Sequence, residues 1–272
     1  MTTATLSQLI ESVQEIDNDN AHGRNFKAQV SSAWMQGRAA FGGLITALAV
    51  TAMQKTLSSP VPLRAIQVLF SGPAAEGTVS ITTHIFRQGR NVTTMRADVS
   101  QEGKICCSVM ASFGAARESI LAVPDNSRPD ATPPESVAPL PFIDGLMPDF
   151  LQNFEVRWAK GSPPYSNTQD TTNGIWARFK ETGTASTAHL IAIADIPPPI
   201  PLSMLSEPAN GSSLTWALEF YGDNWEAAME GWWYIETHVE QCSEGYLQQS
   251  YKIWAPNGQA LAVGQQVMTV FA

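Results

Sequence analysis

Charge, cysteine and long apolar runs are all scarce in this chain of 272 residues, and each shortage excludes a class of protein. Only 15% of the residues are charged while 44% are hydrophobic, which is typical of a packed globular chain and argues against intrinsic disorder. Acidic residues outnumber basic ones by 25 to 16. The resulting charge of −9 argues against nucleic acid or an anionic membrane surface as a partner.

The three cysteines, Cys106, Cys107 and Cys242, are an odd number without metal-ligand spacing. Adjacent side chains in a strand point to opposite faces, so the pair is interpreted as small buried side chains in a reducing compartment. Residues 1–20 lack a basic-then-apolar leader, and the apolar run 44–53 is too short to span a bilayer. The sequence therefore predicts a cytoplasmic protein without a metal, a cofactor or a membrane partner.

Motifs of the common catalytic sites are absent as well. There is no Gly-x-Ser-x-Gly elbow, no His-Glu-x-x-His, no phosphate-binding loop and no dinucleotide fingerprint. The four histidines suggest no catalytic triad and are interpreted as surface or core residues; they are His22, His84, His189 and His238. Any catalysis by this chain would therefore depend on carboxylate, amide and hydroxyl groups.

The first half of the chain predicts strands and one buried helix. Apolar residues at helical spacing predict a helix over 6–16, and alternation predicts a strand over 26–34. The run 44–54, opened by Gly42 and Gly43, carries no charge, so its helix should be buried on every side. Turns with glycine or proline separate four further strands, at 63–70, 78–86, 92–99 and 104–113.

A proline-rich stretch at 124–141 is interpreted as a linker, and the same order of elements then recurs. A helix over 184–194 stops before three prolines at 197–199. The strands predicted around it are 154–158, 175–180, 212–221, 232–239, 247–254 and 259–271. The predicted division is an N-terminal repeat (1–118), a linker (119–145) and a C-terminal repeat (146–272).

A long antiparallel sheet wrapped around one central helix is the hotdog fold, and two in tandem form a double hotdog. The sequence therefore predicts an α+β double hotdog, with a chance likeness between two ordinary α+β domains as the alternative. The two halves differ at one position: the eighth residue after Gly103 is Ala111, whereas the eighth after Gly258 is Gln266. A duplicated fold that keeps one working site and loses the other has this pattern.

An acidic residue also distinguishes the halves. Asp195 lies at helical spacing from apolar residues of the second helix and shares their face; they are Ala188, Ile191 and Ala192. A carboxylate on a buried face costs free energy unless it is paired, so Asp195 is either a structural cap beside the prolines or a functional acid. The corresponding helix of the first half has no acid within 41–54.

A hydroxyl and an amide complete the set of candidate residues. Ser212 and Ser213 begin the strand that runs to residue 221, where serine is commonly only a turn residue. Gln266 lies in the last strand with Gln265 on the opposite face. A buried glutamine needs partners and can hold a water molecule, whereas an exposed one is ordinary surface.

Five passages, in their order along the chain, resemble one family. They are Ala40-Phe41-Gly42-Gly43-Leu44, Phe86-Arg87-Gln88-Gly89-Arg90-Asn91-Val92, Met110-Ala111-Ser112-Phe113, Ile193-Ala194-Asp195, and Gly258-Gln259-Ala260-Leu261-Ala262 followed by Gln266. Their order and spacing resemble the type II acyl-CoA thioesterases, double-hotdog hydrolases of fatty acyl-CoA. The likeness covers nearly the whole chain and implies an acyl-CoA substrate, a role in lipid metabolism and a homodimer.

In that family an aspartate, a threonine or serine and a glutamine position and activate a water molecule. The resemblance implies Asp195, Ser213 and Gln266 as the catalytic residues, with no cofactor and no metal. Ser212 or Thr215 would supply the hydroxyl if the register were shifted. Asp195 would take a proton from the water that attacks the thioester. The helix start at Gly42 and Gly43 is a candidate for polarising the carbonyl but lies in the half without the acid.

Two other functions are weighed against hydrolysis. A double-hotdog enoyl-CoA hydratase would need a paired aspartate and histidine in one site. His189 precedes Asp195 by six residues, about 240° around a helix of 3.6 residues per turn, which argues against that pairing. A non-catalytic acyl-CoA-binding protein with a vestigial site is the other alternative.

Overall fold

Strands of both halves join one antiparallel sheet of twelve strands in this computed structural model, which describes residues 4–16, 23–121, 123, 128–222 and 224–271. The first half contributes β1 (Gln14–Ile16), β2 (Asn25–Val30), β5 (Leu63–Phe70), β6 (Gly77–Gln88), β7 (Val92–Gln101) and β8 (Lys104–Gly114) to this sheet, and its β3 (Met35–Gln36) and β4 (Ala39–Ala40) form a separate pair. Those of the second half are β9 (Phe154–Lys160), β10 (Thr172–Phe179), β11 (Asn210–Phe220), β12 (Trp233–Ser243), β13 (Tyr246–Trp254) and β14 (Ala260–Phe271). Their spatial order is β1-β2-β6-β7-β8-β5-β11-β14-β13-β12-β10-β9.

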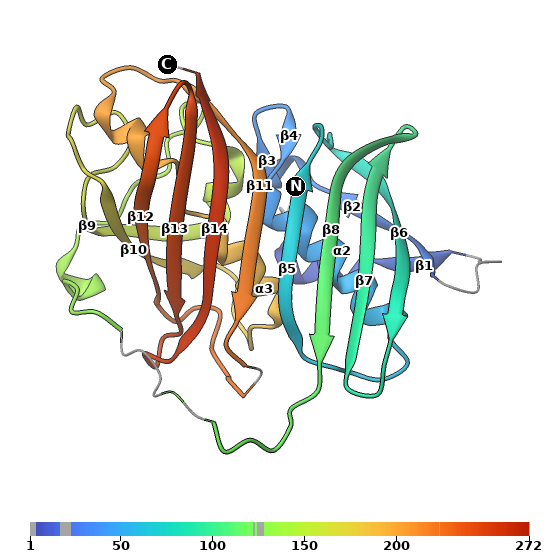
Figure 1. The fold of residues 1–272 in the computed structure, drawn as a ribbon. Coiled ribbons are helices and arrows are strands. Elements are labelled where there is room, and N and C mark those ends of the chain that lie inside the picture. Colours follow the sequence, from blue (N-terminus) through green and yellow to red (C-terminus); the bar gives the residue numbers. More distant parts are fainter. Residues whose placement is uncertain (1–3, 17–22, 122, 124–127, 223, 272) are drawn as a thin grey trace.

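The two halves meet where β5 pairs with β11, at the middle of the sheet (Figure 1). The register runs antiparallel from Leu69 opposite Thr215 to Ala65 opposite Glu219. β5 is the last strand of the first half's part of the sheet, and β11 is the first strand of the second half's part. Their pairing makes the sheet continuous. The pairing of β5 with β11 also positions the candidate active site, because residues of both halves come together beside it on the inner face of the sheet.

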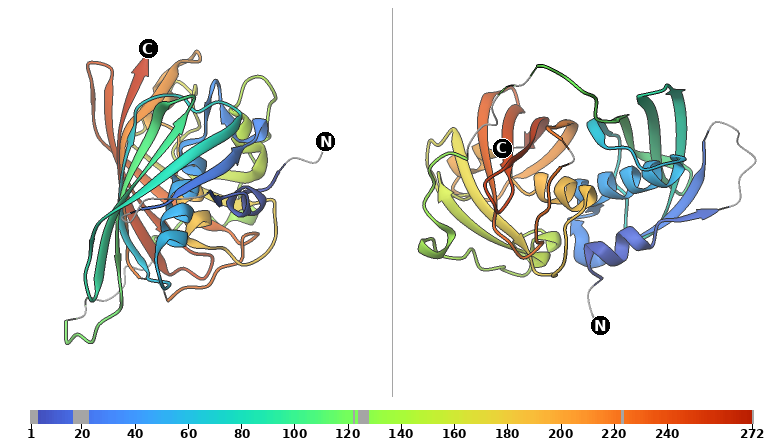
Figure 2. Two further views of the ribbon diagram at one scale, coloured as in Figure 1. Left: turned by 90° about the vertical axis from the view of Figure 1, so that its right-hand side faces the viewer. Right: turned by 90° about the horizontal axis from the view of Figure 1, so that it is seen from below.

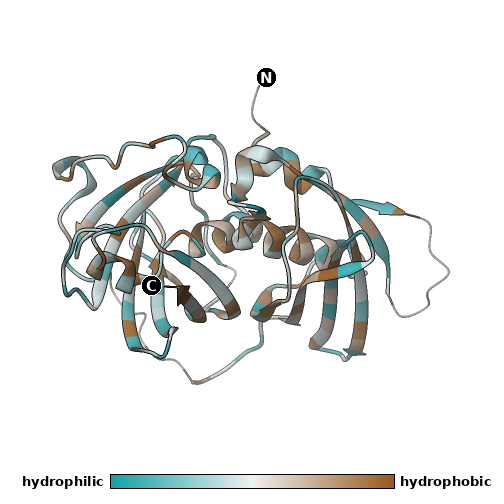
Figure 3. Ribbon diagram, turned by 90° about the horizontal axis from the view of Figure 1, so that it is seen from above, coloured by the Kyte–Doolittle hydropathy of each residue, from teal (hydrophilic) through white to brown (hydrophobic). Residues whose placement is uncertain are grey.

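Helices cover only the inner face of the sheet (Figure 2). They are α1 (Leu6–Glu11), α2 (Gly42–Thr56) and α3 (Thr187–Ala194). The two central helices, α2 and α3, pack against each other between the curved halves of the sheet, and Figure 3 shows them as largely hydrophobic. Burial alternates along the strands beneath them, as in β6, where Val79, Ile81 and Thr83 are buried. The predicted α+β double hotdog is confirmed.

Glycine makes the close approach of the two central helices possible. A Cβ atom on Gly43 would lie 3.0 Å from the Ala192 Cα of α3 and 2.7 Å from the Phe41 ring. Any larger residue there would push the helices apart. The charge-free run predicted as a buried helix is confirmed as the body of α2, of which Gly42 and Gly43 form the first turn.

Some element boundaries predicted from the sequence are wrong. The first helix ends at Glu11, where the Ser12 hydroxyl donates to the Leu9 carbonyl, and Gln14–Ile16 form β1 instead of a further helical turn. Strand β2 ends at Val30, after which a short 3-10 helix, η1 (Ser32–Trp34), begins. The second-half helix begins only at Thr187. Local hydrogen bonds that compete with strand or helix continuation cause these differences.

The end of the segment predicted as a linker packs against the second half. The Leu140 N–H bonds the Val156 carbonyl, and the Trp176 indole donates to the Thr132 carbonyl at 2.8 Å. Residues 122 and 124–127 of that segment lie outside the described residues, as does His22. None of the described helices is long and apolar enough to cross a membrane.

Candidate active site

Asp195 lies at the meeting point of the two central helices. It is the C-cap residue of α3, just beyond the last helical residue, with φ −97° and ψ 5°. Its carboxylate accepts a hydrogen bond from the Gly43 N–H in the first turn of α2. A Cβ atom on Gly42 would lie 2.7 Å from the Asp195 Oδ2 atom, so only glycine leaves room for the carboxylate there.

This arrangement makes Asp195 a cap supplied by the other half of the chain. The residue before α2 is Phe41, which has no side-chain oxygen to accept the free N–H groups of the first turn. The carboxylate of Asp195 accepts one of them and lies at the positive end of the helix dipole. The first half, whose own helix carries no acid, therefore donates a hydrogen bond to the acid of the second half.

Gln266 holds the opposite side of the same carboxylate. It lies on β14, is 2% exposed, and its Nε2 donates to the Asp195 Oδ1 at 2.6 Å. The structure thus brings together Asp195 and Gln266, which are 71 positions apart in the sequence. Their contact meets the requirement that a buried amide be hydrogen-bonded.

Ser213 borders the same cavity as Asp195. A bulge at Leu214 separates the pair Ser213–Met268 from the pair Thr215–Val267. Thr215 is exposed and does not border the cavity, whereas Ser212 does. The Ser213 hydroxyl makes no hydrogen bond to any residue in the described part of the chain, so it remains available to a water molecule or a ligand.

The cavity has a volume of about 420 Å³ and lies where the two halves join. Its walls come from both halves and include Ile45, Phe70, Cys106 and Cys107, with Asp195 among the lining residues. The lining is mixed, because polar side chains such as Arg38 and Ser213 lie beside the apolar ones, and its volume is in the range of small-molecule sites. Within the described ranges, no group of three or more His, Cys, Asp or Glu side chains is arranged to hold a metal ion.

Burial governs the ionisation of the groups around the cavity. Although Asp195 borders the cavity, desolvation raises its pKa to about 7, against the opposing hydrogen bonds from Gln266 and Gly43. Desolvation also raises the pKa of the Cys107 thiol, with the charges of neighbouring acids adding to the effect, and it raises that of Cys106. Asp195 is therefore suited to proton transfer near neutral pH, and the two thiols to packing.

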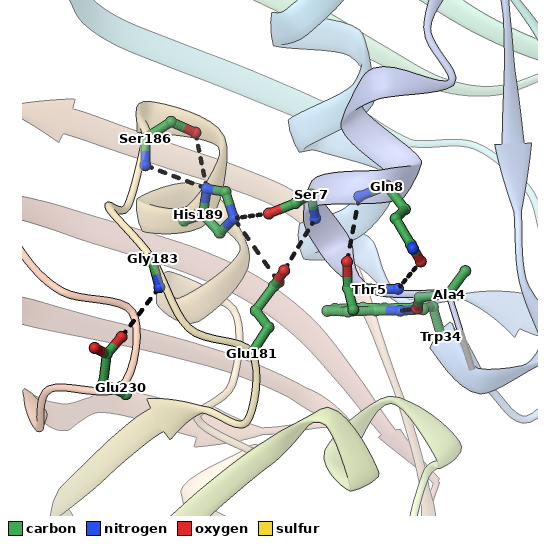
Figure 4. A network of polar contacts seen from close by, with 10 residues as sticks. All are labelled: Ala4, Thr5, Ser7, Gln8, Trp34, Glu181, Gly183, Ser186, His189 and Glu230. Atoms are coloured by element: carbon green, nitrogen blue, oxygen red, sulfur yellow. Dashed lines mark hydrogen bonds and ion pairs between the residues drawn. The ribbon is translucent and has the colours of Figure 1, made fainter. Parts of the chain in front are cut away.

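His189 belongs to a separate network at the start of α3 (Figure 4). The Ser186 N–H donates to its Nδ1 at 3.2 Å, so the ring proton is on Nε2, which faces the Ser7 hydroxyl at 3.2 Å and Glu181 at 3.8 Å. Burial lowers the His189 pKa, while Glu181 opposes the shift. An Nε2 that already carries a proton does not accept one from Ser7. The network therefore caps α3 and binds α1 to it.

Ala111 of the first half and Gln266 of the second half, matched by their spacing from a glycine, also occupy equivalent positions in the sheet. Ala111 pairs with Ile66 on β5 and Met95 on β7. Gln266 pairs in the same way with Trp216 on β11 and Gln249 on β13. The sequence comparison therefore matches positions that are equivalent in the sheet, and the first half is apolar where the second half is polar.

Gln249 was missed at the sequence level, and Gly43 was considered only as a donor to the substrate carbonyl, not to Asp195. Gln249 is fully buried on β13 beside Gln266. Its signal in the sequence is alternation, because Leu247 and Tyr251 on either side of it are also buried on the inner face. The Gly43 contact has no such signal, since it depends on how the two halves pack.

Comparison with known proteins gives matches over most of the chain. The family model of the acyl-CoA thioesterase N-terminal domain matches residues 30–114, and that of the C-terminal domain matches residues 134–270. No curated protein matches the chain in sequence.

Solved structures match its fold over the full length. A hotdog-fold protein of unknown function from Alicyclobacillus acidocaldarius has a TM-score of 0.85 at 22% identity, covering 100% of this chain and 99% of its own. The tesB protein of Mycobacterium avium subsp. paratuberculosis has a TM-score of 0.77 at 15% identity, covering 99% and 100%. An acyl-CoA thioesterase II of Mycobacterium marinum has a TM-score of 0.75 at 15% identity, covering 98% of each chain.

Proposed function

The chain belongs to the acyl-CoA thioesterase family, and from that membership we propose that it hydrolyses a fatty acyl-CoA to a free acid and CoA by water that Asp195 activates. The observation that carries this proposal is the carboxylate of Asp195, which borders a cavity and has its pKa raised by burial to about 7. A general base is most effective when its pKa is near the working pH.

The proposed reaction needs no covalent intermediate on the protein. Asp195 accepts a proton from water as the water oxygen bonds to the thioester carbonyl carbon. The carbon–sulfur bond then breaks, and the proton returns from Asp195 to the departing CoA sulfur. Ser213 holds the water or the thioester oxygen with its available hydroxyl. Gln266 acts through its hydrogen bond to Asp195, which fixes the direction of the carboxylate.

The setting of this activity is also a proposal. We place the reaction in cytoplasmic lipid metabolism, with the acyl chain in the cavity between the halves. We propose a homodimer of double hotdogs, in which residues 1–118 and 146–272 form the two repeats and 119–145 connects them. The site needs both repeats of one chain, because Asp195 and Gly43 come from different halves.

Release of free thiol from a series of acyl-CoAs of increasing chain length tests the proposed hydrolysis. The wild type should release CoA. Gln266→Ala should lower kcat about 10- to 100-fold, because that rate ratio corresponds to the free energy of one hydrogen bond to a charged group. Ala111→Gln, the reverse change at the equivalent position of the first half, should leave the rate unchanged. Binding without thiol release would instead indicate an acyl-CoA-binding protein, and hydration of crotonyl-CoA a hydratase.

The pH dependence of kcat/KM is a second expected result. Only the ionised carboxylate of Asp195 accepts a proton, and its pKa is raised from the ordinary 3.8 to about 7. The rate should therefore rise with pH, reach half its maximum near pH 7 and level off about one unit above that. A rate that is flat between pH 5 and 9, or that falls through this range, would exclude Asp195 as the base.

A further inference from the structure

A second glutamine lies behind the proposed site. Gln249 on β13 is fully buried and stands directly opposite Gln266 in the register of β13 and β14. A side-chain amide removed from water costs free energy unless its donor and acceptor are both satisfied. Gln249 therefore needs hydrogen-bond partners for its amide, and these partners connect it through Gln266 to Asp195.

Three hydrogen bonds connect a backbone amide to the carboxylate. The Ile200 N–H donates to the Gln249 Oε1 at 3.4 Å. The Gln249 Nε2 donates to the Gln266 Oε1 at 3.4 Å, and the Gln266 Nε2 donates to the Asp195 Oδ1 at 2.6 Å. Ile200 is the first residue of the short 3-10 helix η4 (Ile200–Met204), so its N–H has no partner within that helix.

The direction of this series of three hydrogen bonds is fixed at Ile200, the end farthest from Asp195. A glutamine amide can rotate to exchange its oxygen and nitrogen, and the hydrogen-bond network decides which orientation is present. A backbone N–H can only donate, so Ile200 requires the oxygen of Gln249. Gln249 must then present its NH₂ to Gln266, and Gln266 must present its own NH₂ to Asp195.

Asp195 consequently receives donors from both sides, Gln266 on one and the Gly43 N–H on the other. Two donors stabilise the ionised carboxylate against the cost of its burial. Asp195 also borders the cavity, where water would bind. Without a fixed direction, Gln266 could rotate and place its oxygen against the carboxylate, which would favour the protonated acid instead.

The first half provides an internal comparison. Met95 occupies the position of Gln249, and Ala111 that of Gln266. Both residues are buried and neither has an amide. The first half, which has no acid at its central helix, thus lacks both amide donors, whereas the second half has the acid and both glutamines. The equivalent position of the first half therefore accommodates a buried methionine.

We propose that Gln249 is a positioning residue of the thioesterase site: relayed through Gln266, its amide keeps a hydrogen-bond donor directed at Asp195. The inference rests on the proposed function for its effect on turnover. Its effect on the ionisation of Asp195 is independent of any substrate and can be measured without one.

Gln249→Met tests the proposal with the residue that the first half carries at this position. The variant should fold, lower kcat about 5- to 20-fold with KM changed less than twofold, and move the midpoint of the pH profile upward by about half a unit. Gln249→Glu should shift it further, because a carboxylate accepts from both Ile200 and Gln266 and so turns the Gln266 oxygen toward Asp195. Gln248→Met, the same change on the opposite face of β13, is the matched control and should leave both values unchanged.

Carbon-13 NMR of labelled aspartate carboxyl groups, assigned with Asp195→Asn, measures the same shift in the absence of substrate. An upward shift of the Asp195 midpoint in Gln249→Met supports the positioning role, even if the wild type releases no thiol from any acyl-CoA. Loss of activity in Gln249→Met with an unchanged midpoint in both measurements would show a merely structural residue and overturn the proposal. The proposal would also be overturned if Gln249→Met kept the kcat of the wild type and the same pH midpoint of Asp195.

Discussion

Asp195→Asn is expected to lower kcat about 10³- to 10⁴-fold, the upper part of the range for losing a general base. The substitution keeps the size of the side chain and one acceptor for Gln266 or Gly43, but it removes the group that takes the proton from water. KM should change little, because the acyl chain contacts the cavity walls instead. Thiol release under saturating acyl-CoA measures the loss, and a variant within tenfold of the wild-type rate would mean that another group activates the water.

Stability gives an independent check on the same variant. The folded chain retains a proton on Asp195 between about pH 4 and 7, whereas the unfolded chain has lost it, since burial raises the folded pKa from 3.8 to about 7. The contribution of this group to the free energy of unfolding therefore falls as pH rises through that window. Asp195→Asn lacks this dependence, so its melting temperature should rise relative to the wild type between pH 5 and pH 8. A constant difference would indicate that the pKa of Asp195 is ordinary.

Gly42→Ala is expected to reduce kcat about 10²-fold although it adds only one methyl group. The new Cβ atom would lie 2.7 Å from the Asp195 Oδ2 and 3.1 Å from the Phe70 ring. The carboxylate must move to avoid it, and a displacement near 1 Å in an active site costs on the order of 10²-fold in rate. The helix itself should tolerate the change, because alanine favours helical backbone more than glycine does.

The matched control is Gly222→Ala, whose Cβ would meet no atom within 4 Å in the described part of the chain. It should retain wild-type activity and stability. Gly42→Ala should also keep a cooperative melting transition by circular dichroism, which separates displacement of Asp195 from unfolding. Wild-type turnover in Gly42→Ala would contradict the close contact between α2 and the carboxylate.

The fold could be predicted from the sequence because its signals are local. A long run without charge predicts the buried helix that became α2, and glycine turns mark the ends of the strands. Gly103 and Gly258 both adopt positive φ, 77° and 87°, as their turns require. The start of α3 was misplaced because Ser186 and His189 cap the helix through their side chains, and a hydrophobic pattern carries no trace of that bond.

The site could be predicted only in part, for a related reason. Asp195 and Gln266 each break an apolar pattern, so each stands out in its own half, and their contact follows from the fold. The hydrogen bond from Gly43 depends on packing between α2 and α3, and the one from Ile200 depends on a loop meeting the inner face of the sheet. Neither contact is encoded by spacing along the chain.

A single turnover in water enriched in oxygen-18 tests the central claim most directly, namely that water activated by Asp195 attacks the thioester itself. With enzyme in excess over an acyl-CoA that it hydrolyses, direct attack predicts one oxygen-18 atom in the acid formed in the first turnover. If the carboxylate of Asp195 instead attacked the substrate and water then opened the resulting anhydride at the aspartate, the first acid would be unlabelled. Unlabelled acid, or no acid from any acyl-CoA of the series, would contradict the account.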